Sequence, residues 1–273
     1  MVNRYLQIAL SLSVIFTCVF YQNTQVIAGV ITIETGTSVT VTGDLLKTSV
    51  TTENKGDEPA YNVQVHLTLL GERESGPVKA RIDKGQKEKV TFEKIFSEFK
   101  KGRYPLVVMV DFHDANQYPF SAVSCTTFFL KEDASSDLVC LGKNISIKES
   151  GRLEFKIRNP GSGFKPVRPR LILPKELSTP VSQTDLRLDA GEEKTTNFDI
   201  KNFSALPEAS YPVFCLLEYD FKDTHFTSIV RSIVTIKKDE NWFSSTKKYW
   251  IGAAFLLALI IVALQFKTRK SRQ

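Results

Sequence analysis

The sequence lacks the residue patterns that would point to an enzyme. It has only three histidines and two tryptophans in 273 residues. No serine, cysteine or glutamate lies in a nucleophile-elbow or zinc-protease motif, and no glycine-rich loop precedes a helix that could hold a phosphate. Because a catalytic centre needs a nucleophile or a base with a partner, we expect that the chain is not an enzyme and that it binds no cofactor.

The sequence also lacks a basic surface for nucleic acid, although its formal net charge is +6. All 30 acidic residues lie between positions 29 and 248, whereas five of the 36 lysines and arginines lie outside that span. The part of the chain expected to fold therefore carries 31 minus 30, or +1. The basic excess belongs to the chain ends, where membranes respond to it. We expect no nucleic-acid partner.

A secretory signal peptide is expected at residues 1–28. Arg4 supplies a positive charge, an apolar stretch follows it, and Val26-Ile27-Ala28 offers small residues at a cleavage site. The alternative is an uncleaved first membrane helix. Either version would carry the following domain across a membrane.

The C-terminus carries a second membrane signal, at residues 249–266. These 18 residues have no charge, which is just long enough for a helix to span a bilayer. The tail that follows, 267–273, has four basic residues in seven, and such flanks stay in the cytoplasm. With a linker at 239–248, this predicts a single-pass type I membrane protein whose folded domains lie on the extracytoplasmic side, in the periplasm or at the cell surface.

One stretch of the sequence occurs twice, at 81–131 and at 187–237. Both copies begin with Arg-apolar-Asp-x-Gly, contain a Tyr-Pro step that opens an apolar run, and end in lysine. The shared glycines, Gly85 and Gly191, are 106 residues apart. A period near 100 residues is too long for a solenoid repeat and is typical of tandem domains. We expect two modules that each fold alone, at 29–132 and 133–238.

The periodicity within both modules is that of β-strands. Residues 63–69 alternate between apolar and polar side chains, which predicts one buried and one wet face and places His66 on the wet one. Seven short runs in about 100 residues, with no helical period, predict an all-β fold of two tandem immunoglobulin-like sandwiches. The expected strands are 38–42, 46–53, 61–70, 78–83, 87–93, 104–112 and 119–131 in the first module, and 144–148, 152–158, 167–173, 185–188, 194–200, 211–220 and 226–237 in the second.

Tyr104 and Tyr211 open the sixth strand of each module. This position matches the tyrosine corner of immunoglobulin-like sandwiches, in which the hydroxyl bonds back to the chain a few residues upstream. Neither module, however, has a cysteine pair between its second and sixth strands or a tryptophan in its expected core.

Several turn motifs together resemble a known family. An Asn-x-Gly turn (54–56 and 159–161), an apolar-Asp-x-Gly turn before the fifth strand and a small-x-Tyr opening of the sixth occur in both modules. The set resembles the CARDB-type domains of bacterial and archaeal adhesion-related proteins and a similar sandwich module found beside some glycosidases; 173–177 and 188–193 look especially like the latter. The resemblance covers roughly 35–237. It implies a sandwich fold in a membrane-anchored cell-surface protein, and no shared catalytic residues.

Acidic residues cluster near the turn between the sixth and seventh strands of each module, close to His113 and His225. Oxygen ligands of this kind suit calcium. Aspartate and histidine are also ordinary turn residues, and the spacing differs between the two copies, so we expect no metal. The candidate ligands, if there is a site, are Asp111, Asp114, Asp220 and Asp223.

Three cysteines remain after the signal peptide. A Cys125–Cys140 disulfide would rigidify the junction between the modules, and a Cys140–Cys215 disulfide within the second module competes with it. Three buried free thiols are the remaining alternative. Two sequons, at Asn144 and Asn202, predict glycosylation if the source organism glycosylates its proteins.

Taken as a whole, the sequence predicts a non-catalytic binding or scaffold protein at the cell envelope, in contact with another protein or a glycan. The alternative is an accessory subunit of a membrane transport or export complex, in which the helix makes specific contacts. Small residues at 252–254 would let helices pack closely, but they lie only at the outer end of the helix, which favours a simple anchor.

Overall fold

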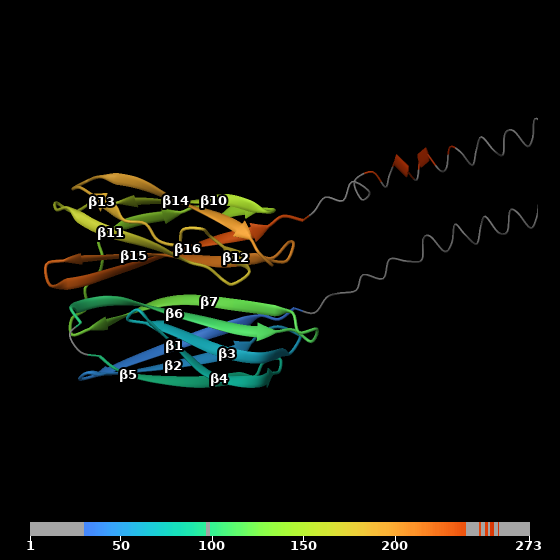
Figure 1. Cartoon of the computed structure of the whole chain (residues 1–273), viewed down its shortest axis with the longest axis horizontal. Helices are drawn as coiled ribbons and strands as arrows, with labels where there is room; N and C mark the ends of the chain where they lie inside the picture. The colour runs from blue at the N-terminus through green and yellow to red at the C-terminus, as the bar shows by residue number, and fades with distance from the viewer. Residues whose placement is uncertain are drawn as a thin grey trace, which may run out of the picture.

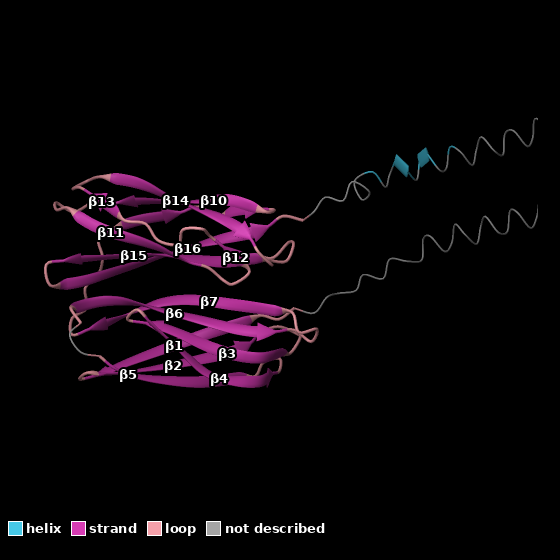
Figure 2. Ribbon diagram, in the orientation of Figure 1, coloured by secondary structure: helices cyan, strands magenta, loops and turns pink. Residues whose placement is uncertain are grey.

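The computed structural model describes residues 30–96 and 99–238, together with the single positions 246, 249, 250, 252, 253 and 256. The two long ranges are built from strands and connecting loops (Figure 2). Among all described residues, no helix is long and apolar enough to cross a membrane. The predicted signal peptide lies outside the described residues, as do most positions of the predicted linker, membrane helix and tail.

The first module, residues 30–132, packs a three-stranded sheet against a four-stranded one (Figure 1). Every second residue of the strand Leu45–Asn54 is buried, because alternate side chains of a strand point to the same face. The smaller sheet has the order β1-β2-β5: β1 (Ile33–Thr42), β2 (Leu45–Asn54) and β5 (Lys87–Ile95). The larger has the order β4-β3-β6-β7: β3 (Ala60–Leu69), β4 (Glu72–Ile82), β6 (Lys101–His113) and β7 (Pro119–Leu130).

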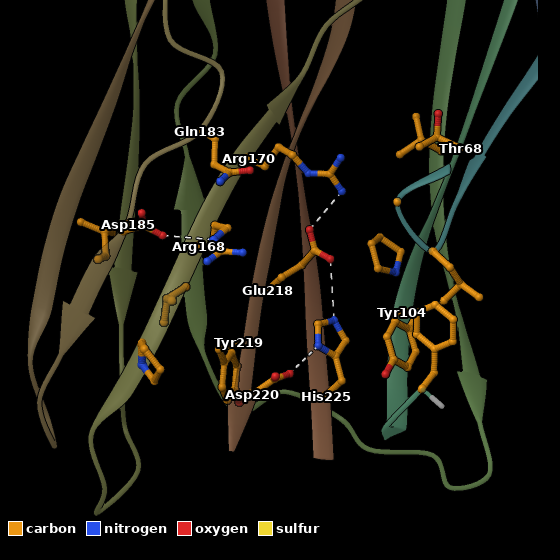
Figure 3. Close-up of a pocket in the computed structure, with 18 residues that line it drawn as sticks. Thr68, Tyr104, Arg168, Arg170, Gln183, Asp185, Glu218, Tyr219, Asp220 and His225 are labelled. Atoms are coloured by element: carbon orange, nitrogen blue, oxygen red, sulfur yellow. Dashed lines mark hydrogen bonds and ion pairs between the residues drawn. The ribbon is translucent and has the colours of Figure 1, made fainter. Parts of the chain in front are cut away.

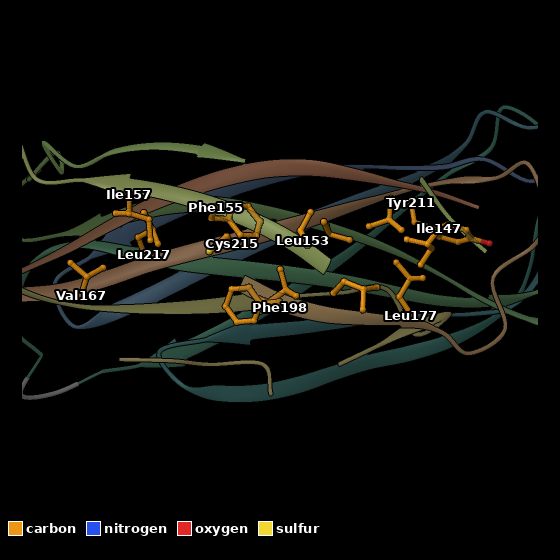
Figure 4. Packing of buried hydrophobic residues seen from close by; sticks show 14 of the residues in the cluster. Ile147, Leu153, Phe155, Ile157, Val167, Leu177, Phe198, Tyr211, Cys215 and Leu217 are labelled. Atoms are coloured by element: carbon orange, nitrogen blue, oxygen red, sulfur yellow. The ribbon is translucent and has the colours of Figure 1, made fainter. Parts of the chain in front are cut away.

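The second module, residues 133–238, has its own core of buried apolar side chains (Figure 4). Phe155 and Phe198 meet edge to face there, with ring centroids 6.1 Å apart. One sheet has the order β12-β14-β10-β8: β8 (Val139–Gly142), β10 (Ser150–Arg158), β12 (Leu177–Ser178) and β14 (Glu193–Asn202). The other contains β9 (Ile145–Ile147), β11 (Lys165–Ile172), β13 (Leu186–Leu188), β15 (Ser210–Phe221) and β16 (Thr224–Ile236).

The strand prediction is confirmed for all fourteen expected strands. Most bounds agree within three residues; β1 and β4 begin earlier than expected, at Ile33 and Glu72. Two strands were not predicted, β8 and β12, which have four and two residues. Runs that short contain too few alternations for a period of two to be visible.

Both tyrosine corners are present, with opposite hydrogen-bond directions. The Tyr104 hydroxyl donates to the carbonyl of Lys100 at 2.8 Å. The Tyr211 hydroxyl instead accepts from the backbone N–H of Leu206 at 2.9 Å. Each bond ties the start of a core strand to the loop before it.

Replacing Tyr104 by phenylalanine is expected to lower the free energy of unfolding by about 1 kcal/mol, because one net hydrogen bond is lost. Equilibrium urea unfolding followed by circular dichroism measures the change. Tyr61→Phe is the control, since the structure gives the Tyr61 hydroxyl no hydrogen bond among the described residues, and it should change stability by less than about 0.5 kcal/mol. Equal losses in the two variants would contradict a role for the Tyr104 hydroxyl.

The two modules pack face to face, with β6 and β7 of the first against β15 and β16 of the second (Figure 1). Val107, Val123 and Leu216 form a small apolar cluster between them. At one end, the start of β16 pairs in parallel with the start of β6, through Thr224 and His225. The second module therefore covers part of the outward face of the larger sheet of the first module, around β6 and β7.

His66 shows the effect of this cover, and its predicted solvent exposure is wrong. The residue is 8% exposed. Its ring nitrogens bond to Ser75 Oγ at 2.7 Å and to Asp111 Oδ2 at 2.8 Å. Asp111 also pairs with Lys175 of the second module. Alternation correctly separates the two faces of β3, but the second module lies where solvent was expected.

The strand-containing part of the chain, residues 30–238, begins and finishes at the same end of the two sandwiches (Figure 1). We call this end the base; its loops include 55–59, 114–118 and 203–209. The opposite end, which we call the tip, carries the β1–β2 turn, the end of β5 and the β15–β16 turn. The β6–β7 turn lies at the base and the equivalent β15–β16 turn at the tip, so the two modules are stacked in opposite directions.

Candidate functional site

A pocket of about 500 Å³ lies between the two modules (Figure 3). The first module contributes the β3–β4 turn and the start of β6. The second contributes β11, the loop before β13, the end of β15 and the start of β16. Ligand pockets of roughly 300–1,000 Å³ commonly form at such junctions between domains.

A chain of charged side chains runs along the pocket floor (Figure 3). Arg170 Nη2 lies 3.0 Å from Glu218 Oε2, and Glu218 Oε1 lies 3.7 Å from His225 Nε2. His225 Nδ1 bonds to Asp220 Oδ1 at 2.7 Å. The other oxygen of Asp220 accepts from Lys100 Nζ at 2.7 Å, which extends the chain into the first module.

The pKa values of His225, Glu218 and Asp220 favour the ionised forms of these side chains. Burial alone would lower the pKa of His225, but hydrogen bonds and charges from Glu218 and Asp220 raise it above its usual value. Burial alone would raise the pKa of Glu218, yet His225 and Arg170 hold it below its usual value. The pKa of Asp220 is lowered in the same way, against burial, by Lys100 and His225.

Two tyrosines line the pocket beside this chain. The Tyr104 ring stacks on the His225 ring, with centroids 4.3 Å apart and an angle of 14° between the planes. Burial, followed by the nearby charge of Asp220, raises the pKa of Tyr104 to about 12. Burial likewise raises the pKa of Tyr219 to about 12. Both hydroxyls keep their protons at neutral pH, so they act as hydrogen-bonding groups and not as bases.

The mouth of the pocket is polar and exposed. Arg168 pairs there with Asp185, with Nε and Oδ1 3.1 Å apart, and Gln183 lies beside them. Because both side chains of this pair are more than half exposed, at 61% and 81%, a polar ligand can displace it at little cost. The site is suited to hydrogen bonding with a polar partner.

The His225 network makes stability depend on pH. The folded-state pKa of His225 is raised, so its contribution is present below about pH 6.5, the usual histidine value, and is lost as the pH rises through the folded pKa. We therefore expect the stability difference between the wild type and His225→Gln to be largest near pH 6 and to shrink as the pH rises. Urea unfolding at several pH values measures it. A difference that stays constant across the series would contradict the network.

The four candidate metal ligands do not converge. Asp111 bonds to His66, and Asp114 accepts from the N–H groups of Asn116 and Tyr118 at 2.9 and 2.8 Å, which shapes the turn. Asp220 bonds to His225 in the pocket, and Asp223 is exposed in the turn at the tip. In the described part of the chain, no three His, Cys, Asp or Glu residues are arranged to hold a metal ion.

A chelator is expected to leave the melting temperature of the protein unchanged. An ion bound only by the native state would stabilise it by about 2.7 kcal/mol at a hundredfold excess over Kd. Its removal would lower the melting temperature by roughly 10 °C for domains of this size. Calorimetric scans with and without EDTA measure this. A loss restored by calcium and abolished by Asp114→Asn would contradict the expectation.

All three cysteines are free thiols in the structure. Cys125 packs against the cluster between the modules, whereas Cys140 and Cys215 both pack in the second core. Burial raises the pKa of Cys125 and of Cys140 to about 12 and also raises that of Cys215, so all three are poor nucleophiles. Of the two disulfide predictions, Cys140–Cys215 is the one whose partners share a core, and it stays a prediction.

The two sequons differ in how their asparagines are held. Asn144 accepts from the N–H of Ile233 through Oδ1, at 2.9 Å. The amide nitrogen of Asn202, the atom that would carry a glycan, donates to the carbonyls of Lys148 and Ala205 at 3.3 Å each. A glycan would disturb the chain less at Asn144.

Arg170 and Glu218 were not among the residues predicted to form a site. They are 48 positions apart, and only the pairing of β11 with β15 brings them together. One signal was available: Glu218 interrupts the apolar run of β15, most of which is buried. A charged residue in such a position needs a partner.

No protein-family model matches the chain, and no curated protein matches it. Among solved structures, it is similar to a red sea bream transglutaminase, at 12% identity and a TM-score of 0.27, over 77% of this chain and 31% of that one. It is also similar to an Escherichia coli alpha-2-macroglobulin activated by porcine elastase (9%, TM-score 0.31, 76% and 22%). A protein of unknown function from Porphyromonas gingivalis W83 is similar over 75% of this chain and 99% of its own (9%, TM-score 0.31). The chain thus spans less than a third of the first two, and these values are too low to assign it to a family.

Proposed function

We propose that this chain is a non-catalytic, membrane-anchored binding or scaffold protein whose two modules act on the extracytoplasmic side. The observation that carries the proposal is the pocket between the modules. Its ionised side chains pair with one another across elements of both modules, which suits it to recognition and leaves no free base or nucleophile at its floor. The signal peptide, the anchor and the CARDB-type assignment belong to the proposal and rest on the sequence.

A glycan or a polar segment of another protein is the class of partner that this pocket fits. Arg168, Arg170 and Gln183 offer donors at its wall, and Asp185 and Glu218 offer acceptors. Polar groups that converge on a concave site fix the orientation of a ligand. The pairs also neutralise one another, which favours an uncharged polar ligand over a strongly charged one.

Binding of the full-length protein in detergent to glycan and peptide arrays tests the proposal. We expect a ligand whose binding is lost in Gln183→Trp, because an indole at the mouth would fill the pocket. Lys156→Trp is the matched control, since Lys156 is also an exposed polar residue but lies on β10, in the sheet that faces away from the pocket. Equal binding by both variants would show that the pocket is not the site.

Protease applied to the extracytoplasmic side of sealed vesicles tests the topology. It should remove residues 29–245 and leave a tag after Gln273 intact, whereas digestion of the tag would contradict the proposal. Replacement of 249–266 by an unrelated apolar helix separates the binding protein from the alternative, an accessory subunit of a transport or export complex. If the helix is a simple anchor, the protein keeps its function; if the helix makes specific contacts in a complex, the function is lost.

A further inference from the structure

Two large apolar side chains project from the base of the molecule. Phe203 is 78% exposed and Leu206 is 43% exposed, and both lie in the loop between β14 and β15. Phenylalanine and leucine are among the residues most often found buried, so an exposed pair in one short loop is a candidate contact surface.

The loop that carries them is held firmly by backbone hydrogen bonds. The carbonyl of Glu176 accepts from the N–H of Phe203 at 2.9 Å and from the next N–H at 3.1 Å. The hydroxyl of Tyr118, in the first module, donates to the carbonyl of the residue after Phe203 at 2.9 Å. Tyr211 accepts from the N–H of Leu206. The two side chains are thus presented in a fixed position, which lowers the entropic cost of a contact.

Exposed lysines lie next to this loop. Lys237 follows β16, and the next residue, Lys238, pairs with Glu208 of the loop, with Nζ and Oε2 3.1 Å apart. Lys201 ends β14 directly before the loop, and the carbonyl of Lys148 accepts from the side chain of Asn202. Lysines beside exposed apolar residues are typical of surfaces that contact anionic lipid.

The path of the chain brings this loop close to a bilayer. The described sandwich ends at Lys238, at the base, and ten residues separate it from the apolar segment that begins at Tyr249. Ten residues span at most about 35 Å when fully extended. The thirteen residues of β16 rise roughly 43 Å from tip to base. If 249–266 spans the membrane, the base is the end that faces it.

We propose that Phe203 and Leu206 dock into the surface of the bilayer that holds the chain, with the neighbouring lysines against anionic headgroups. This inference rests on the membrane anchor of the proposed function. It adds that the sandwiches are held with the tip directed away from the membrane, because a second point of attachment restricts the swing about the linker.

Quenching of tryptophan fluorescence by brominated acyl chains tests the contact. The full-length protein is reconstituted in vesicles of phosphatidylcholine and phosphatidylglycerol, and Trp242→Phe and Trp250→Phe remove the native tryptophans. Phe203→Trp is then compared with Ile95→Trp, a matched control that is also 78% exposed in the native protein but lies at the tip. We expect the emission loss in the Phe203→Trp protein to be several-fold larger. Insertion in either direction gives the same result, since the base always faces its own leaflet.

Each other outcome overturns a stated part of the inference. In a protein that carries Trp242→Phe but keeps Trp250 and Phe203, quenching of Trp250 reports the anchor itself. If Trp250 is quenched and the Phe203→Trp protein is not, the anchor stands and the docking is wrong. If neither is quenched, the anchor fails and the docking fails with it. Equal quenching in the Phe203→Trp and Ile95→Trp proteins would show that the molecule lies on the membrane without a preferred end. Circular dichroism spectra that match the wild type confirm that both variants are folded.

Discussion

Replacing Glu176 by alanine is expected to lower the free energy of unfolding by about 3 kcal/mol. Glu176 is 1% exposed and belongs to the second module. Its Oε1 accepts from the N–H of Ser121 at 2.6 Å, and its Oε2 accepts from the hydroxyl of the same residue at 2.7 Å, across the contact between the modules. The substitution leaves two buried polar groups of the first module without their acceptor. Equilibrium urea unfolding measures the loss.

Two further variants separate this contact from a general effect of removing a carboxylate. Glu193→Ala removes an exposed carboxylate from β14 and should cost less than about 0.5 kcal/mol. Ser121→Ala combined with Glu176→Ala should cost clearly less than the two single losses together, because the residues share one interaction. Additive losses would show that the two residues act independently.

Replacing Gly102 by alanine is expected to destabilise the protein by about 3 kcal/mol and to open the junction between β6 and β16. Gly102 has a φ of +131°, which only glycine adopts readily, and strain of this kind costs roughly 1–3 kcal/mol. A Cβ there would also lie 2.0 Å from the carbonyl oxygen of His225, so the backbone of the second module would have to move. Amide hydrogen exchange at the start of both strands should become faster.

Gly85→Ala is the matched control for this substitution. Gly85 also has a positive φ, of +72°, and its counterpart Gly191 has a φ of +73°. No atom lies within 4 Å of a Cβ added at Gly85. Its loss should be limited to the backbone preference, about 1 kcal/mol. Equal losses at Gly85 and Gly102 would mean that the close approach between the modules contributes nothing to stability.

The fold within each module could be predicted because its signals are local. In a strand such as β3, apolar and polar side chains alternate between adjacent residues. Turns such as 54–56 are marked by asparagine and glycine. The tyrosine corner also follows from its position at the start of a strand, and the structure confirms the bond from Tyr104 to Lys100. The hydrogen-bond direction at Tyr211 was not predictable, since it depends on how the loop before β15 turns.

The contact between the modules could not be predicted, because its partners are far apart in sequence and none of them is unusual in its own segment. Ser121 and Glu176 are 55 positions apart. Lys100 and Asp220 are 120 positions apart. Alternation placed His66 on the outward face of its strand but could not show that another module covers this face. The pocket is formed by the same contact, so it could not be predicted either.

The position of β16 determines how the molecule would carry a mechanical load. This strand leads toward the C-terminus, pairs antiparallel with β15 from Thr224 to Thr235, and pairs in parallel with β6 at its start and with β9 at its end. A pull applied along the chain from the base, against a partner held near the tip, would act parallel to these strands. The hydrogen bonds along β16 would then be loaded together in shear, and would not open one after another from a free end. Resistance to force would therefore depend on the length of this one strand and on its three neighbours.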